Sequence, residues 1–363
     1  MPSNISSTDI MLKTNEFFLN KYKKSIFFGE GINDPKGIFG TTLNLHKKFK
    51  DRVLECPISE NGFTGLAIGA ALNKYYTCVI HQRVDFSLLA LEQVINNAAK
   101  TYFITAGQYT VPITIRCIIG RGWGQGPQHS QSLENMYASI PGLKVVIPST
   151  PKDFGELYLA SLLDPNPVIF LEHRWCHYNY TSIDNNYFKN LIKSKPRIKN
   201  KFLKRGKKAT VVSNSYNTIV ILNIVKWLKD KWKINANIDH IDMKYLDYND
   251  KNILKSVSKT NQLFIFDLGH KYINFGSEII ANLVRYNPNI FKKNIHHYGL
   301  PFYPTPSSRH LAKNYYIDFS DFVLSLLSLE KVSLLVKKNI ISDFKQNIGK
   351  FSDIPSDDFK GPF

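Results

Sequence analysis

The sequence predicts an α/β protein, with a parallel-sheet domain followed by a smaller α/β domain. Short β-rich runs alternate with helix-period segments from about residue 50. This order favours parallel strands with helices over both faces of the sheet. The alternation stops near residue 178 and resumes near residue 208, which indicates a second domain. The length of 363 residues agrees with two domains.

We expect the first domain to span residues 1–177. Its run Val111–Ile119 is rich in β-branched residues, as in strands that are buried on both faces. Ser87 stands at the expected N-cap of a long helix. The expected strands are 53–56, 77–81, 111–119, 143–147 and 167–171, and the expected helices are 63–72, 87–103, 133–139 and 153–163.

Residues 178–207 form a polar stretch that ends in KNKFLKRGKK, and we expect a linker there. The second domain is expected over 208–328, and residues 329–363 are expected to form a charged tail with one amphipathic helix at 331–344. In the second domain the expected strands are 209–213, 235–243 and 262–267, and the expected helices are 218–229, 251–258 and 274–284.

The charge is strongly basic, since 47 Lys and Arg against 29 Asp and Glu leave a net +18. Such a surplus is typical of proteins that bind nucleic acid, anionic membranes or acidic partners. Most lysines are scattered, however, and no groove-reading or base-stacking motif accompanies them. We therefore expect no nucleic-acid partner.

The four cysteines show no Cys-x-x-Cys spacing, which argues against a disulfide framework or a structural zinc site and favours a reducing compartment. The longest apolar stretch, Thr218–Leu228, is interrupted by Asn223 and Lys226 and is too short to cross a bilayer. The N-terminus resembles neither a signal peptide nor a transit peptide. A soluble cytoplasmic protein without a membrane segment is expected.

A glycine-rich loop, Gly120–Ser132, follows the run Val111–Ile119 directly. Ligands of parallel sheets bind beyond the carboxyl ends of the strands, so the position indicates a binding loop. Its glycines at 120, 122, 124 and 126 match neither a dinucleotide fingerprint nor a P-loop. Either the loop brings backbone to a ligand and presents His129, or it is a flexible turn with an incidental histidine.

Two further clusters contain reactive side chains. Glu60, in CPISENGF, stands between a strand and a helix, where a carboxylate either serves a site or merely stabilises the helix N-terminus. His173–His177 contains two histidines and a cysteine. A metal site needs a further ligand, so we expect this segment to pack at the end of a strand.

Taken together and in this order, four segments resemble the beta subunit of the thiamine-diphosphate-dependent 2-oxo acid dehydrogenases. They are ISENGFTGLAIGAAL, HQRVDFSLLALEQVINNAAKTYF, GPQHSQSLENMYASIPGLKVVIPSTPKD and DPNPVIFLEHR. The resemblance covers residues 25–175 closely and 209–315 more loosely. It implies a pyrimidine-binding domain for thiamine diphosphate, followed by a domain similar to the transketolase C-terminal domain.

The resemblance also implies a role for individual residues. Glu60 matches the carboxylate that binds the aminopyrimidine ring of the cofactor, which acts as an electron sink. Phe86 matches the aromatic residue that packs on this ring. His129 matches the active-site histidine, which moves protons or steers the acyl acceptor. Glu30, in FFGEGI, matches the acidic residue of the family's GE(D/E)V segment.

The metal sites of the family divide between two chains. The family binds Mg²⁺ through a Gly-Asp-Gly motif, and this sequence contains none. The resemblance therefore implies a separate alpha subunit that supplies Mg²⁺ and the diphosphate site, in a heterotetramer. It also implies a potassium ion held largely by backbone carbonyls, at positions that match Ile113, Ser161, Asp164 and Asn166.

Several segments depart from the family pattern and leave the substrate open. HQRVD contains basic residues where the pyruvate enzymes are more apolar or acidic, and LEHRW, DLGHKYINFGSEI and PTPSSRHL also differ. The first hypothesis is a 2-oxo acid decarboxylating component that acylates lipoamide and docks on a lipoyl acyltransferase.

Two alternatives stand beside that hypothesis. The basic residues suit a phosphorylated or carboxylated acceptor, which favours a split transketolase-like enzyme that transfers a carbon fragment to a sugar or other small acceptor. A non-catalytic basic scaffold is the third possibility. The loop GPQHSQS differs from the GPTH-type loop of transketolases, and this favours the first hypothesis.

Overall fold

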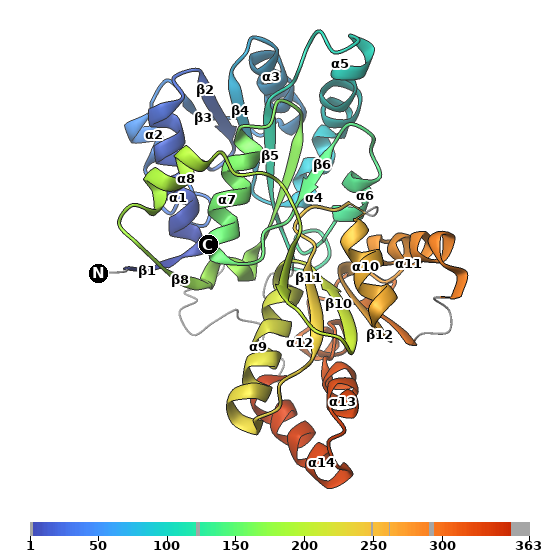
Figure 1. Cartoon of the computed structure of the whole chain (residues 1–363). Coiled ribbons are helices and arrows are strands. Elements are labelled where there is room, and N and C mark those ends of the chain that lie inside the picture. Colours follow the sequence, from blue (N-terminus) through green and yellow to red (C-terminus); the bar gives the residue numbers. More distant parts are fainter. Residues whose placement is uncertain (1–2, 121–123, 248–249, 261, 290–293, 350–363) are drawn as a thin grey trace. The chain divides into compact units, whose positions relative to one another are not determined.

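The computed structural model describes residues 3–120, 124–247, 250–260, 262–289 and 294–349. The chain separates into two compact units (Figure 1). Within the described residues, unit 1 comprises the chain up to Lys199 together with Lys244–Leu246, and unit 2 comprises Asn200–Met243 and the chain from Asp247 to Gly349. Each unit is an α/β fold with its own sheet, as the sequence predicts.

The sheet of unit 1 has six strands in the order β3-β2-β4-β5-β7-β6, and every strand pair is parallel. All seven residues of β5 are buried, which confirms the central strand that its β-branched run predicts. The strands are β2 (Ser25–Gly29), β3 (Val53–Glu55), β4 (Tyr76–His81), β5 (Ile113–Ile119), β6 (Lys144–Val146) and β7 (Val168–His173).

Helices cover both faces of this sheet. Cys78 of β4 contacts the hydroxyl of Tyr158 at 3.5 Å, whereas His81 of the same strand packs on Phe63 with 5.3 Å between ring centroids. Residues three apart in a strand point to opposite faces, so the helices that contain Tyr158 and Phe63 lie on opposite sides. The main helices are α1 (Ser7–Lys21), α3 (Glu60–Leu72) and α7 (Pro151–Leu162), with shorter α2 (Leu45–Lys48) and α6 (Glu134–Ala138).

The prediction of one regular helix that begins at Ser87 is wrong, because the helical region begins earlier and is irregular. The helical region begins at Val84, and it passes through α4 (Val84–Ser87), a 3₁₀ turn (Leu88–Ala90), a π-helical stretch (Gln93–Ala98) and α5 (Ala99–Ile104). Ser87 does not cap it. Its buried hydroxyl bonds to the Val84 carbonyl at 2.6 Å and to the Tyr137 hydroxyl at 2.5 Å, because a serine within a helix can use the carbonyl three residues back.

The sheet of unit 2 has five strands in the order β13-β12-β10-β11-β9, in which only the edge strand β9 is antiparallel to its neighbour. The sequence predicts three of these strands and misses β9 and β13. The strands are β9 (Lys201–Lys204), β10 (Ala209–Ser213), β11 (Ile238–Asp242), β12 (Gln262–His270) and β13 (Asn294–Leu300), and the helices are α9 (Ser215–Trp232), α10 (Lys251–Lys259), α11 (Phe275–Tyr286), α12 (Arg309–Tyr315) and α13 (Ser320–Leu329).

The segment expected as a linker, 178–207, contains regular structure. Its strand β8 (Tyr180–Ile183) pairs with β1 (Ser3–Ser6) in antiparallel register. Its helix α8 (Tyr187–Ser194) buries Phe188, Leu191 and Ile192, the spacing of one apolar helical face. Its last part forms β9.

Much of the expected tail also belongs to the packed part of unit 2. Helix α14 (Leu334–Asp343) and the turn Phe344–Ile348 follow α13. Ile340 and Phe344 are fully buried and join the hydrophobic cluster of unit 2. Residues 350–363 lie outside the described part of the chain.

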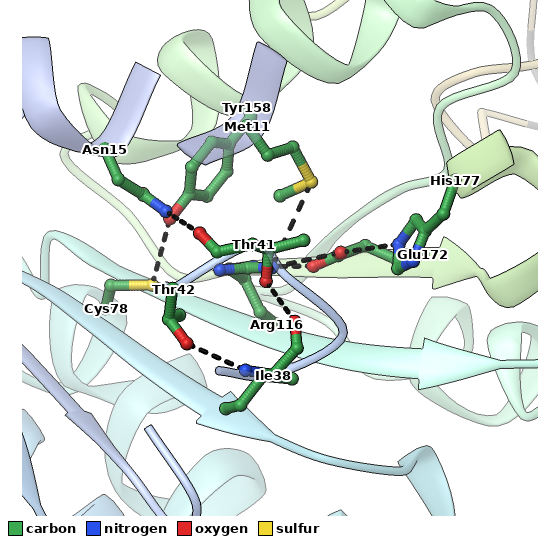
Figure 2. A network of polar contacts seen from close by, with 10 residues as sticks. All are labelled: Met11, Asn15, Ile38, Thr41, Thr42, Cys78, Arg116, Tyr158, Glu172 and His177. Atoms are coloured by element: carbon green, nitrogen blue, oxygen red, sulfur yellow. Dashed lines mark hydrogen bonds and ion pairs between the residues drawn. The ribbon is translucent and has the colours of Figure 1, made fainter. Parts of the chain in front are cut away.

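A buried polar network joins strands and loops of unit 1 (Figure 2). The Arg116 guanidinium on β5 binds both carboxylate oxygens of Glu172 on β7, at 2.5 and 3.0 Å. Glu172 also contacts Nε2 of His177 at 3.1 Å, and Arg116 donates to the Thr41 hydroxyl at 2.9 Å. The network therefore ties β5 and β7 to the loop before α2.

None of the helices within the described residues is long and apolar enough to cross a membrane.

Candidate active site

The four predicted site residues follow four adjacent strands of unit 1. Glu60 comes after β3, Glu30 after β2, Phe86 after β4 and His129 after β5, and these strands are neighbours in the order β3-β2-β4-β5. The carboxyl ends of parallel strands meet at one edge of a sheet, where ligands bind. The structure thus brings all four to one edge.

Two carboxylates lie close together at this edge. Glu60 is the first residue of α3 and is only 7% exposed. Glu30 follows β2, and its pKa is raised by burial and then by the charges of Glu60, Glu55 and Asp34. A carboxyl group beside other carboxylates holds a proton more readily. The pKa of Glu30 therefore lies above that of an isolated, solvated carboxyl group.

The turn after Glu30 is held by residues that the sequence analysis did not single out. The Glu55 carboxylate accepts from the backbone N–H groups of Gly31 at 2.7 Å and Asn33 at 3.0 Å. Gln82 donates to the Glu30 carbonyl at 3.2 Å. Gly31 has φ +71°, and an added Cβ would lie 2.1 Å from Nε2 of Gln82. The FFGEGI segment therefore needs glycine at this position.

Phe86 and His129 form the aromatic part of the site. Their rings are 5.5 Å apart between centroids and nearly perpendicular at 86°, a favourable edge-to-face arrangement. Both side chains are partly exposed. His129 closes a turn through its N–H to the Gly126 carbonyl at 3.3 Å. The structure places this imidazole beside Phe86. Arg121–Trp123, within the same glycine-rich loop, lie outside the described residues.

Two residues that hydrogen-bond to this loop were not identified from the sequence. Arg83 and Asp85 stand just before Phe86 and hydrogen-bond to Gln125 and Gln131, on either side of His129. The basic character of HQRVD is the signal in the sequence that points to Arg83. Both contacts are made to residues that flank His129 in the loop.

The segment His173–His177 completes β7 and a 3₁₀ turn, Arg174–Tyr178. Its residues are buried, and His177 contacts Glu172 in the network of Figure 2. Within the described residues, no group of three or more His, Cys, Asp or Glu side chains is arranged to hold a metal ion.

The residues matched to a potassium site gather near the turn between α7 and β7. Asp164 N–H bonds to the Ser161 carbonyl at 3.1 Å, and Asn166 N–H bonds to Asp164 at 3.0 Å. The pairing of β5 with β7 brings Ile113 beside this turn. Oδ1 of Asn166 is buried and has no hydrogen-bond partner among the described residues. A buried oxygen without a hydrogen-bond partner fits a hard cation, although Lys144 already pairs with the Asp164 carboxylate at 2.6 Å.

The two units and this site edge define a transketolase-like class of protein. Residues 11–176 match the family described as "Transketolase, pyrimidine binding domain", and residues 199–321 match "Transketolase, C-terminal domain". A solved structure titled "Split gene transketolase, inactive beta4 tetramer" superposes with a TM-score of 0.67 at 15% identity, over 92% of this chain and 100% of that chain. At that identity the superposition shows the fold alone.

Curated relatives define the family more closely. The chain is 34% identical to the pyruvate dehydrogenase E1 component subunit beta of Porphyra purpurea, over 70% of this chain and 75% of the relative. It is 35% identical to the protein of the same name from Gracilaria tenuistipitata var. liui, over 74% of this chain and 80% of the relative. It is 31% identical to the mitochondrial subunit beta of Caenorhabditis elegans, over 78% of this chain and 80% of the relative. The chain belongs to the family of E1 beta subunits of thiamine-diphosphate-dependent 2-oxo acid dehydrogenases, which confirms the predicted resemblance.

Proposed function

We propose that this chain acts with a separate alpha subunit to decarboxylate a 2-oxo acid and to transfer the acyl group to lipoamide. The observation that supports this most strongly is the gathering of Glu30, Glu60, Phe86 and His129 at one sheet edge, in a chain of the E1 beta family. Family membership favours this activity over the split transketolase-like alternative.

Thiamine diphosphate, when bound, supplies the electron sink for decarboxylation. Glu60 fits its aminopyrimidine ring, because a carboxylate that is 7% exposed at a helix start has little competing water. We propose that Glu60 holds the proton on the pyrimidine ring nitrogen. Glu30 lies near Glu60, because burial and then the charge of Glu60 raise the pKa of Glu30.

Phe86 and His129 complete the proposed site. The partly exposed ring of Phe86 offers a flat apolar surface for the pyrimidine. His129 lies edge-on to that ring, and an imidazole can both accept and donate a proton. We propose that His129 guides the acyl acceptor and holds or gives a proton during acyl transfer.

The proposal requires a partner chain. We propose that an alpha subunit supplies the Mg²⁺ ligands and the diphosphate site, because this sequence contains no Gly-Asp-Gly, and that the two chains form a heterotetramer. A lipoyl acyltransferase would then take the acyl group. We further propose a potassium ion at Ile113, Ser161, Asp164 and Asn166, and a cytoplasmic location, since the four cysteines are free thiols.

A purified complex tests this function. The chain is isolated from its native cells with the protein that co-purifies in equal amounts, and it is assayed with thiamine diphosphate, Mg²⁺ and pyruvate or branched-chain 2-oxo acids. We expect oxo-acid-dependent reduction of 2,6-dichlorophenolindophenol. Absence of this reduction, together with transfer of a two-carbon fragment from a ketose phosphate to an aldose phosphate, would replace the proposal with the transketolase-like alternative.

A further inference from the structure

We propose that Arg83 and Asp85 are positioning residues that hold the His129 loop, residues 124–131, over Phe86. The inference rests on the proposed function of His129. It concerns two side chains that contact the loop on opposite sides of the histidine. Their role is to fix where the imidazole lies and not to touch the reacting atoms.

Arg83 holds the first part of the loop. Its Nη2 donates to the side-chain carbonyl of Gln125, four residues before His129. Its Nη1 donates to the backbone carbonyl of Gly120 at 3.5 Å, the last residue before the undescribed stretch. One guanidinium therefore contacts both Gly120 and Gln125, which its fixed fork of donors makes possible.

Asp85 holds the second part of the loop. Its Oδ1 accepts from Nε2 of Gln131 at 2.7 Å, two residues after His129. The Gln131 carbonyl in turn accepts from the Gly120 N–H at 3.2 Å. The loop is thus closed at its base, and its residues before and after His129 are both held.

The loop needs such contacts because its glycine-rich backbone has great conformational freedom. Gly120, Gly124 and Gly126 all have φ between +81° and +86°, a conformation that glycine enters freely but pays for in conformational entropy. A loop of this kind samples many arrangements unless side chains fix it. Small displacements of a reacting group reduce turnover steeply, so fixing the loop bears directly on His129.

Arg83 is itself fixed by its surroundings. It is 3% exposed, and its guanidinium lies over the ring of Phe39 at 5.7 Å, while Arg174 lies over the same ring at 4.3 Å. Burial and the charge of Arg174 lower the pKa of Arg83 to about 10, against the attraction of Asp85. Arg83 therefore stays charged at neutral pH and stays in place, as a positioning residue requires.

The first test measures the loop and not the activity. Amide hydrogen exchange of residues 124–131 is compared in the full chain, its complex and the variants Arg83→Gln and Asp85→Ala. We expect faster exchange in this loop in both variants, with the rest of unit 1 unchanged, because exchange reports local opening. Asp85→Asn keeps an acceptor for Gln131 and should restore slow exchange. Unchanged loop exchange in both variants would overturn the proposal.

The second test separates the two half-reactions in the complex. Arg83→Gln and Asp85→Ala should reduce the kcat of lipoamide acylation about 10- to 100-fold, and dye-linked decarboxylation much less, with Asp85→Asn retaining most acylation. In a His129→Ala background neither variant should cause further loss, since residues that act through one group are not additive.

A matched arginine controls for general destabilisation. Arg52 also donates to backbone carbonyls, of Leu19 at 2.9 Å and Tyr22 at 3.3 Å, far from the loop in sequence. Arg52→Gln should lower the melting temperature without changing loop exchange or the ratio of the half-reactions. Losses that multiply with His129→Ala, or that Arg52→Gln reproduces, would overturn the positioning role. A wild-type complex without 2-oxo acid turnover would overturn the proposed function, and loop exchange would still decide the role of Arg83 and Asp85.

Discussion

Arg116 and Glu172 form a two-pronged ion pair in which both side chains are fully buried. Burial acts to raise the pKa of Glu172, but the guanidinium of Arg116 and the bond to His177 outweigh it and hold that pKa below its ordinary value. Burial of two charges is costly unless each satisfies the other. The pair therefore adds little net stability, but the loss of either partner leaves the other charge buried without a counterion.

The first prediction concerns removal of one charge from this pair. Glu172→Gln keeps the shape of the side chain but leaves the Arg116 charge buried without a counterion. We expect a loss of about 3 kcal/mol or more in the free energy of unfolding of unit 1, measured by urea denaturation. The double variant Arg116→Met/Glu172→Leu should lose less than Glu172→Gln alone, because it leaves no buried charge. A double variant that loses as much stability as Glu172→Gln, or more, would contradict this interpretation.

The second prediction concerns His81 and pH. The His81 imidazole is 2% exposed, and neither ring nitrogen has a hydrogen-bond partner among the described residues. Burial lowers its pKa to about 4, whereas an unfolded histidine binds a proton near pH 6.5. The unfolded chain thus binds more protons between these values, and stability falls as the pH falls from 6.5 towards 4. His81→Phe should remove about 1 kcal/mol of this loss per pH unit, seen in melting temperatures from pH 7.5 to 5.

His240 in unit 2 is the matched comparison for His81. Burial lowers its pKa to about 3, but its Nε2 contacts the Ser213 hydroxyl at 2.7 Å. At pH 7.5 His240→Phe should therefore cost about 1 kcal/mol for the lost hydrogen bond, whereas His81→Phe should cost nothing or stabilise unit 1. Equal costs at pH 7.5 would show that His81 has a partner after all.

The third prediction concerns the C-terminal segment. Phe344 is 1% exposed and contacts Trp227 of α9 with 5.8 Å between ring centroids. Phe344→Ala should destabilise unit 2 by about 3 kcal/mol, through lost burial and the cavity that remains. Phe302→Ala, at a side chain that is 72% exposed, should change the stability far less. Similar melting temperatures for the two variants would mean that the segment after α13 does not pack on unit 2 in solution.

Parts of the fold and site follow from sequence because their signals are local. The buried strand β5 is visible in one β-branched run, and the site residues are visible through the ISE, VDFSLL and GPQHSQS motifs. Local reasoning alone left Glu60 between a helix cap and a site residue. The shared edge that unites it with His129 depends on strand order, which is not a local property.

The missed features depend on contacts between distant residues. Arg116 and Glu172 meet only because β5 and β7 are neighbours, so neither residue is conspicuous in its own run. Strand β13 contains His296 and Tyr298, which appear polar in sequence but stack on Phe264 and Phe266 of β12 at 4.6 and 4.7 Å. Flat rings aligned across two strands stabilise a pair that hydropathy does not reveal.

We propose that the Glu60 carboxylate is this chain's contribution to cofactor activation. The most direct test is deuterium exchange of the thiazolium C2 proton of thiamine diphosphate, followed by NMR after acid quench, in the complex with Mg²⁺. Glu60→Gln should slow this exchange at least 100-fold while cofactor binding, measured by calorimetry, persists. Glu278→Gln, at an exposed carboxylate of unit 2 that pairs with Arg285, should leave the exchange rate at the wild-type value. Exchange in Glu60→Gln at the wild-type rate would contradict the role assigned to Glu60.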